Sequence, residues 1–313
     1  MQNLGRERLL AGLHPAQLEK NPKRESRLVR FARSRPLVLF FVLAYTVAWL
    51  SWLPLVLSRS GLGLIPVDVP IEYCVVGGFA PSLAALLTHW LAEQNLRAFR
   101  LYDSLNKLLL GALVGPVLIV TAFVVVPGLL MTESSLGTLN WRVFSSLAIF
   151  NWSTLFGGPL GEEPGWRGYA LPRLQTSFGP FLASLTLGLL WVAWHLPMFL
   201  VRGWVSVSVG IFAVVAIAAT FLMTYGANIS GFSVIVAVMM HAAFNTCSKL
   251  LNGLLVSAKV RESPPPEAIF ALSSLAMALA VLGFTRGRLG VTSPNRHRFN
   301  EGMHPTAQKP GGG

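Results

Sequence analysis

The sequence has 313 residues, of which 53% are hydrophobic and only 12% are charged, and its mean hydropathy is +0.58. A water-soluble domain carries about 25% charged residues. Half that share leaves too little polar surface to cover a globule in water, so this composition excludes the ordinary soluble classes. The net charge of +12 can indicate a nucleic-acid partner. We expect none, because the chain has no zinc-finger, RNA-binding or recognition-helix pattern.

Apolar stretches of about 20 residues, the length that crosses a bilayer as a helix, recur along the chain. They predict an all-α fold, a polytopic bundle of about eight transmembrane helices. The expected spans are 36–57, 71–92, 108–130, 144–172, 180–200, 206–226, 229–251 and 268–285. The fourth span is the least regular, because it ends in the polar sequence GEEPGWRGYALPRL.

The expected spans divide the chain into a basic N-terminal segment, 1–35, a transmembrane domain, 36–285, and a polar tail, 286–313, which we expect to be disordered. Eight spans place both termini on one side of the membrane. That side collects 19 basic residues and the other side six, so the positive-inside rule predicts cytoplasmic termini. The Ala-, Leu-, Val-, Gly- and Arg-rich composition is typical of a GC-rich bacterial genome and indicates a bacterial inner (plasma) membrane.

Ionisable side chains inside the apolar spans are the most informative feature, because burying them in a membrane is costly and usually functional. Four such residues stand out, namely Glu162, Glu163, His195 and His241, and Asn245 follows His241 on the same helical face. At 1.5 Å per helical residue, Glu162 lies about 16 Å from Arg173, His241 about 15 Å from Gly231 and His195 about 22 Å from Pro180. Similar depths on three spans predict one buried polar site.

Each of these residues also has a purely structural interpretation. Glu163 and Arg167 are four residues apart, so an ion pair within one helix is expected. His195 lies in a tryptophan-rich stretch and can be a packed core residue. His241 and its neighbouring amide can be polar contacts that hold two membrane helices together. These interpretations leave Glu162 without a partner in its own span.

A carboxylate, two imidazoles and an amide in a shielded site suit two kinds of peptide hydrolysis. In the first, Glu162 is a general base that takes a proton from water. One histidine then orients the water or protonates the leaving amine, and His241 and Asn245 donate to the oxyanion. In the second, Glu162, His195 and His241 bind zinc, which activates the water. Neither the HExxH motif nor a GxSxG elbow is present.

Three short motifs resemble those of the CPBP (CAAX protease and bacteriocin-processing) family. They are EExxxR at Glu162–Arg167, FxxxH at Trp191–His195 and HxxxN at His241–Asn245. Their order and their host spans fit the family, and the resemblance covers about residues 140–250. The chain departs from the pattern at Trp191, where the family motif has phenylalanine. Because the replacement is also aromatic, we expect it to have little effect.

The resemblance implies a CAAX-protease-like intramembrane endopeptidase. Glu162 would then be the base, His195 would help to activate the water, and His241 and Asn245 would form an oxyanion hole. Glu163 and Arg167 would support them. The family was first described as metal-dependent and is now more often regarded as glutamate-type.

We expect no cofactor, with zinc on Glu162, His195 and His241 as the alternative. An amide is a poor zinc ligand, and adjacent helical glutamates point about 100° apart. The implied partners are a membrane protein or peptide substrate and the lipid bilayer, and no pattern indicates an oligomeric state. The competing functions are a transporter of the same helical class and a non-proteolytic immunity or scaffold protein.

Overall fold

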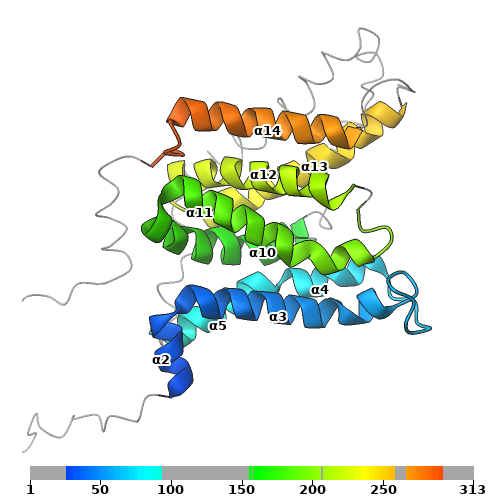
Figure 1. The fold of residues 1–313 in the computed structure, drawn as a ribbon, viewed down its shortest axis with the longest axis horizontal. Coiled ribbons are helices and arrows are strands. Elements are labelled where there is room, and N and C mark those ends of the chain that lie inside the picture. The colour runs from blue at the N-terminus through cyan, green and yellow to red at the C-terminus, as the bar shows by residue number, and fades with distance from the viewer. Residues whose placement is uncertain (1–25, 94–154, 157, 206, 258–265, 292–313) are drawn as a thin grey trace, which may run out of the picture.

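A computed structural model describes residues 26–93, 155–156, 158–205, 207–257 and 266–291, with the backbone alone over 248–257 and at 266. Within these ranges every regular element is a helix, and the long helices lie side by side in a bundle (Figure 1). The predicted all-α class is therefore confirmed. The third expected span, 108–130, the first half of the fourth, and most of the two terminal segments lie outside the described residues.

The described helices agree closely with the expected spans. Five stretches are long and apolar enough to cross a bilayer, so the chain is an integral membrane protein. The first of them, Pro36–Leu57, has the predicted limits. In chain order the elements are α2 (Arg27–Ser34), α3 (Pro36–Leu57), η2 (Ile71–Tyr73), α4 (Cys74–Gly78), α5 (Ala80–Glu93), α10 (Pro159–Gly165), the π-helical turn η5 (Trp166–Ala170), α11 (Leu171–His195), η6 (Leu196–Leu200), α12 (Val209–Ile229), α13 (Val234–Ser257) and α14 (Pro266–Thr285).

The apolar stretch Pro159–Leu200 is a helical hairpin. Trp191 forms a hydrogen bond with Glu162, 29 residues earlier in the chain. A straight helix would hold these two residues about 44 Å apart, so the chain must reverse between them. It does so at Gly179, whose φ of 73° lies in the left-handed region that favours glycine. Pro180 then begins the second arm, as expected from the separate spans 144–172 and 180–200.

Glycines bring α10 into close contact with α4 and α5. A β-carbon on Gly161 would lie within 3 Å of the backbone of Gly78, and one on Gly165 would lie within 3 Å of the backbone of Pro81. Small residues at such crossings let two membrane helices approach backbone to backbone. This seam fixes the position and rotation of α10, which carries Glu162 and Glu163.

The seam predicts a stability difference between two glycine substitutions. Gly165→Ala should lower the free energy of unfolding by about 1–3 kcal/mol, because the new methyl group overpacks a backbone contact. Gly283→Ala is the matched control, because it lies in α14 with no heavy atom within 4 Å of the added carbon. It should be neutral or stabilise by up to about 1 kcal/mol. Thermal unfolding in detergent would compare the two variants, and equal melting temperatures would contradict the seam.

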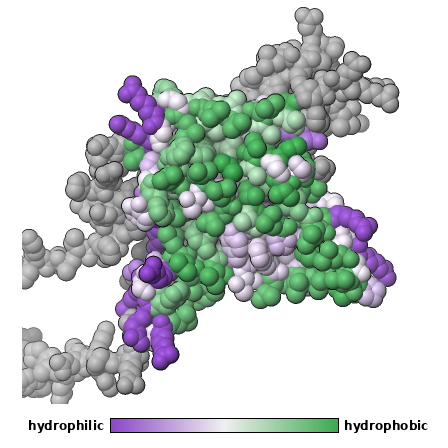
Figure 2. Space-filling model, in the orientation of Figure 1, coloured by the Kyte–Doolittle hydropathy of each residue, from purple (hydrophilic) through white to green (hydrophobic). Residues whose placement is uncertain are grey.

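The molecular surface is apolar between two polar ends. Figure 2 shows one face on which hydrophobic residues cover the middle and hydrophilic residues gather at opposite ends of the bundle. The helix α2 and the residues that follow α14 lie at the same end (Figure 1). There, Asn228 donates to the backbone oxygen of Leu289, which is fully buried. The chain therefore enters and leaves the described bundle on one side.

Candidate active site

The helix α10 presents two buried glutamates in different directions. Glu162 and Glu163 are 4% and 0% exposed, and the backbone N–H of Glu162 donates to Gly158 O at 2.8 Å. Pro164 has no N–H to continue the helix, and α10 passes into a π-helical turn at Trp166, a feature that is frequent at functional sites. Since adjacent helical residues diverge by about 100°, the two carboxylates contact different neighbours.

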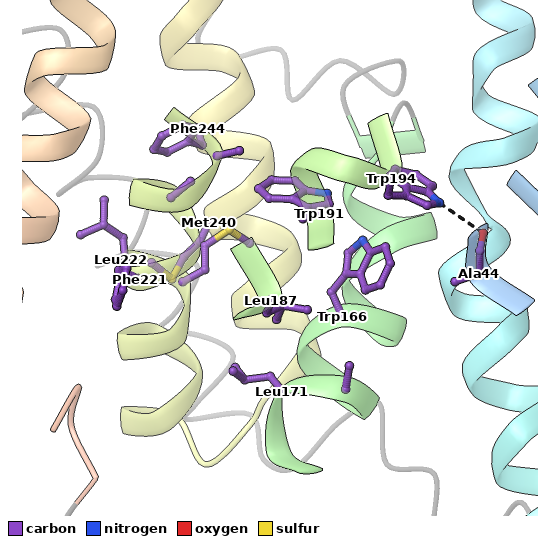
Figure 3. Packing of buried hydrophobic residues seen from close by; sticks show 14 of the residues in the cluster. Ala44, Trp166, Leu171, Leu187, Trp191, Trp194, Phe221, Leu222, Met240 and Phe244 are labelled. Atoms are coloured by element: carbon purple, nitrogen blue, oxygen red, sulfur yellow. Dashed lines mark hydrogen bonds between the residues drawn. The ribbon is translucent and has the colours of Figure 1, made fainter. Parts of the chain in front are cut away.

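The carboxylate of Glu162 is held from α11. The indole N–H of Trp191 donates to Glu162 Oε2 at 2.6 Å, and both side chains are buried. Trp191 lies in the packed core of the bundle, with Trp194 and Trp166 nearby (Figure 3). One oxygen of Glu162 is thus fixed by the protein, while Oε1 faces elsewhere.

The carboxylate of Glu163 joins three helices. Its Oε1 accepts from Arg167 Nη1 at 2.9 Å, which is the pair expected from the sequence spacing, and from His241 Nδ1 of α13 at 2.7 Å. Arg167 also donates to Thr220 of α12 at 3.3 Å. The guanidinium is the counter-charge of Glu163, so the carboxylate accepts the bond and His241 Nδ1 carries a proton. The other ring nitrogen, Nε2, is left to face the space in front of Glu162.

Gly158 keeps that space clear. A β-carbon at this position would lie 2.9 Å from Glu162 Oε1 and 3.7 Å from His241 Nε2. These two distances add up to 6.6 Å, the largest separation that the two atoms can have. A carboxylate oxygen and an imidazole nitrogen therefore lie near each other beside Gly158, close enough for one water molecule or carbonyl group to contact both.

A side chain at Gly158 should strongly reduce the peptide cleavage expected from the motifs without unfolding the protein. In Gly158→Ala, the atoms nearest to the methyl group would belong to the side chains of Glu162 and His241, which can shift, whereas the methyl group of Gly165→Ala would meet the backbone of Pro81. We expect peptide cleavage to fall by about 100-fold, because a 1 Å displacement of reacting groups has an effect of that size. The melting temperature of Gly158→Ala should stay close to that of Gly283→Ala. The measurement compares the cleavage rates of these two variants at equal folded fractions. Full activity in Gly158→Ala would show that no reacting atom occupies this space.

His195, the last residue of α11, also contacts Trp191. Its Nδ1 donates to the backbone oxygen of Trp191 at 2.9 Å, because a carbonyl group only accepts. The ring stacks on Trp204 at 5.4 Å and meets Phe212 edge-on at 5.1 Å. Both His195 and His241 pack edge-on against Trp191, at 5.7 and 5.2 Å between ring centroids. Both imidazoles therefore contact the same indole ring.

The described residues do not provide a complete metal site. Among them, no three His, Cys, Asp or Glu side chains are grouped so that they could hold a metal ion. The alternative zinc ligands Glu162, His195 and His241 are not grouped in this way among those residues, whereas a zinc site requires three converging protein ligands.

The structure connects all but one of the predicted site residues through hydrogen bonds or ring contacts. Glu162, Glu163, Arg167 and His241 form one connected cluster, and His195 adjoins it through Trp191. Asn245 lies one turn beyond His241 on α13, half-buried, and its side chain forms no hydrogen bond with the residues that the structure describes.

Three further residues of the cluster were not predicted from the sequence. They are Trp191 as a hydrogen-bond donor, Thr220 as a partner of Arg167, and Gly158 beside the open space. The available signals were weak. They were an indole in place of the motif's phenyl ring, a threonine within the apolar span 206–226, and a glycine-rich stretch immediately before the glutamates.

Comparison with known proteins identifies the family. Residues 144–247, which carry this whole cluster, match the sequence model of a family described as type II CAAX prenyl endopeptidase Rce1-like. This region, about a third of the chain, is thus similar to the CPBP/CAAX protease family. The chain is also 46% identical over 41 residues to CAAX prenyl protease 2 of Methanococcus maripaludis, an alignment that spans 13% of this chain and 15% of that relative. The family resemblance carried by the three motifs is thus confirmed.

Proposed function

We propose that this protein is an intramembrane endopeptidase that hydrolyses peptide bonds of membrane proteins or peptides with a water molecule activated by Glu162. The observation that carries the proposal is the shared space at Gly158, bordered by Glu162 Oε1 and His241 Nε2 inside an apolar bundle. A carboxylate can take a proton there while an imidazole stabilises the charge that develops opposite it. The matched family supports the same class of reaction.

In the first step, Glu162 Oε1 takes a proton from the water, and the water oxygen forms a bond to the carbonyl carbon of the peptide. The carbonyl oxygen then carries a negative charge. His241 meets it with Nε2 in the protonated form of the ring, because Nδ1 is already bonded to Glu163. With His241 protonated, the charges of Glu162, Glu163, Arg167 and His241 sum to zero, which suits a buried cluster.

In the second step, the carbon–nitrogen bond breaks as the oxyanion collapses, and the leaving amine takes the proton that Glu162 accepted. Two residues assist in this proposal. Asn245, one turn after His241, supplies a second donor to the oxyanion. His195 accepts the remaining hydrogen of the water with Nε2, since its Nδ1 is bonded to the backbone of Trp191. No metal ion takes part.

We further propose that the end of the bundle that holds α2 faces the cytoplasm of a bacterial cell. At the opposite end, the loop between α3 and η2 carries Arg59, which bonds to Asp68, and its Ser60 backbone oxygen accepts from the backbone N–H of Arg202. Arg59 and Arg202 are thus the basic residues that we assign to that end. The positive-inside rule then favours the end with more basic residues, which is the α2 end, as the cytoplasmic one. Among the described residues the basic side chains at that end are Arg27, Arg30, Arg33, Arg35, Arg173, Arg286 and Arg288.

The deciding experiment offers the purified full-length protein, in detergent and in vesicles, a library of membrane-spanning peptides in ¹⁸O-labelled water. Mass spectrometry would identify the products. We expect ¹⁸O in the new carboxyl terminus of each cleaved peptide, and the same rate with a zinc chelator present. Cleavage that is lost on chelation and restored by zinc alone would establish a metal mechanism. Folded protein that cleaves no peptide would favour a transporter or a non-proteolytic immunity or scaffold protein.

A further inference from the structure

Trp191 contacts four of the five ionisable residues of the candidate site. They are Glu162, Arg167, His195 and His241, and the exception is Glu163. The indole N–H of Trp191 bonds to Glu162 Oε2 at 2.6 Å, and the guanidinium of Arg167 lies over the indole ring, 4.8 Å from the centroid. The indole ring also packs edge-on against His241, and the backbone oxygen of Trp191 accepts a hydrogen bond from His195 Nδ1. A residue with these four contacts sets the relative positions of the groups around it.

The hydrogen bond to Glu162 is the most consequential of these contacts. Among the residues that the structure describes, Trp191 supplies the only donor to this carboxylate. With Oε2 fixed, the plane of the carboxylate is set and Oε1 is directed to the space at Gly158. A phenylalanine, which the family motif has at this position, keeps the ring packing but has no N–H to donate.

Other tryptophans of the bundle form a different kind of bond. The indoles of Trp49, Trp52 and Trp194 donate to the backbone oxygens of Trp194, Cys74 and Ala44, respectively. Figure 3 shows the bond from Trp194 to Ala44. Such bonds hold helices together without touching an ionisable side chain. Among the described tryptophans, Trp191 alone directs its N–H to a carboxylate.

We propose that Trp191 is the positioning residue of the general base, and that its indole N–H fixes Glu162 Oε2 so that Oε1 addresses the reacting water. This inference deepens the proposed function and rests on it. It also revises the sequence-based expectation that an aromatic replacement at this position has little effect. In this chain the tryptophan is part of the catalytic arrangement although it does not touch the substrate.

Three variants separate the hydrogen bond from packing. Trp191→Phe removes the donor and some volume. Site-specific replacement of Trp191 by 3-benzothienylalanine keeps the shape and puts sulfur in place of the N–H. Trp194→Phe is the matched control, because Trp194 is equally buried on the same helix but bonds to backbone. We expect both Trp191 variants to lose about 10- to 100-fold in kcat, the range for a hydrogen bond to a charged group, with KM changed less than about threefold. Trp194→Phe should lower the melting temperature and keep kcat within about threefold.

A second measurement needs no activity. The indole N–H resonance of Trp191, assigned by its absence in Trp191→Phe, should shift in Glu162→Gln, because a neutral amide is a weaker acceptor than a carboxylate. The resonances of Trp49, Trp52 and Trp194 should stay in place. The proposal is overturned if both Trp191 variants keep kcat within twofold of the wild type, or if the Trp191 indole resonance does not shift in Glu162→Gln. Wild-type protein that cleaves nothing would refute the proposed function, and the resonance would still decide whether Trp191 holds Glu162.

Discussion

Glu162→Gln should lower peptide cleavage by about 10²- to 10⁴-fold, the contribution of a general base. The amide has nearly the same shape as the carboxylate, and its oxygen can still accept from Trp191, so the local fold should be kept. The amide cannot take a proton from water. We therefore expect kcat to fall while substrate affinity and melting temperature stay close to those of the wild type.

A matched control is available on the loop between α3 and η2. Asp68→Asn makes the same change from carboxylate to amide on a side chain that is 75% exposed, and it should leave cleavage unchanged. Cleavage kinetics and thermal unfolding of both variants in one detergent make the comparison. If Glu162→Gln kept a tenth or more of the wild-type kcat, Glu162 would not be the base.

The largest effect on stability is expected at Arg167. Arg167→Met leaves the Glu163 carboxylate, which is 0% exposed, without its guanidinium partner. Removing one partner of a buried ion pair costs about 3–5 kcal/mol, so the melting temperature in detergent should fall strongly. Adding Glu163→Gln should recover part of the loss, because the double variant no longer buries an unpaired charge. A double-mutant cycle over the four proteins measures the coupling.

The pair Arg59–Asp68 provides the reference for this cycle. It has nearly the same length, 2.8 Å, but its side chains are 59% and 75% exposed. Surface ion pairs contribute about 0–1 kcal/mol, so Arg59→Met should change the unfolding free energy by less than that. If Arg167→Met were no more costly than Arg59→Met, the buried pair would not stabilise the bundle.

The sequence by itself determined the features that depend on local chemistry. The limits of Pro36–Leu57 could be predicted because a lipid-exposed backbone must satisfy its hydrogen bonds within the helix, which requires an uninterrupted apolar run. The Glu163–Arg167 pair could be predicted because residues four apart share one helical face. The membrane class and the family followed from composition and from three short motifs. None of these needs knowledge of how one helix packs on another.

Only the tertiary structure decided which way the polar groups point between helices. The bonds from Trp191 to Glu162 and from His241 to Glu163 join residues 29 and 78 positions apart. Helical periodicity fixes which residues share a face, but the rotation of a helix against its neighbours comes from packing. Here the glycine seam between Gly161 and Gly78 and the reversal at Gly179 set that rotation. They turn Glu162 toward Trp191 and Glu163 toward His241, and so make a motif residue expected to be interchangeable with phenylalanine the hydrogen-bond donor to Glu162.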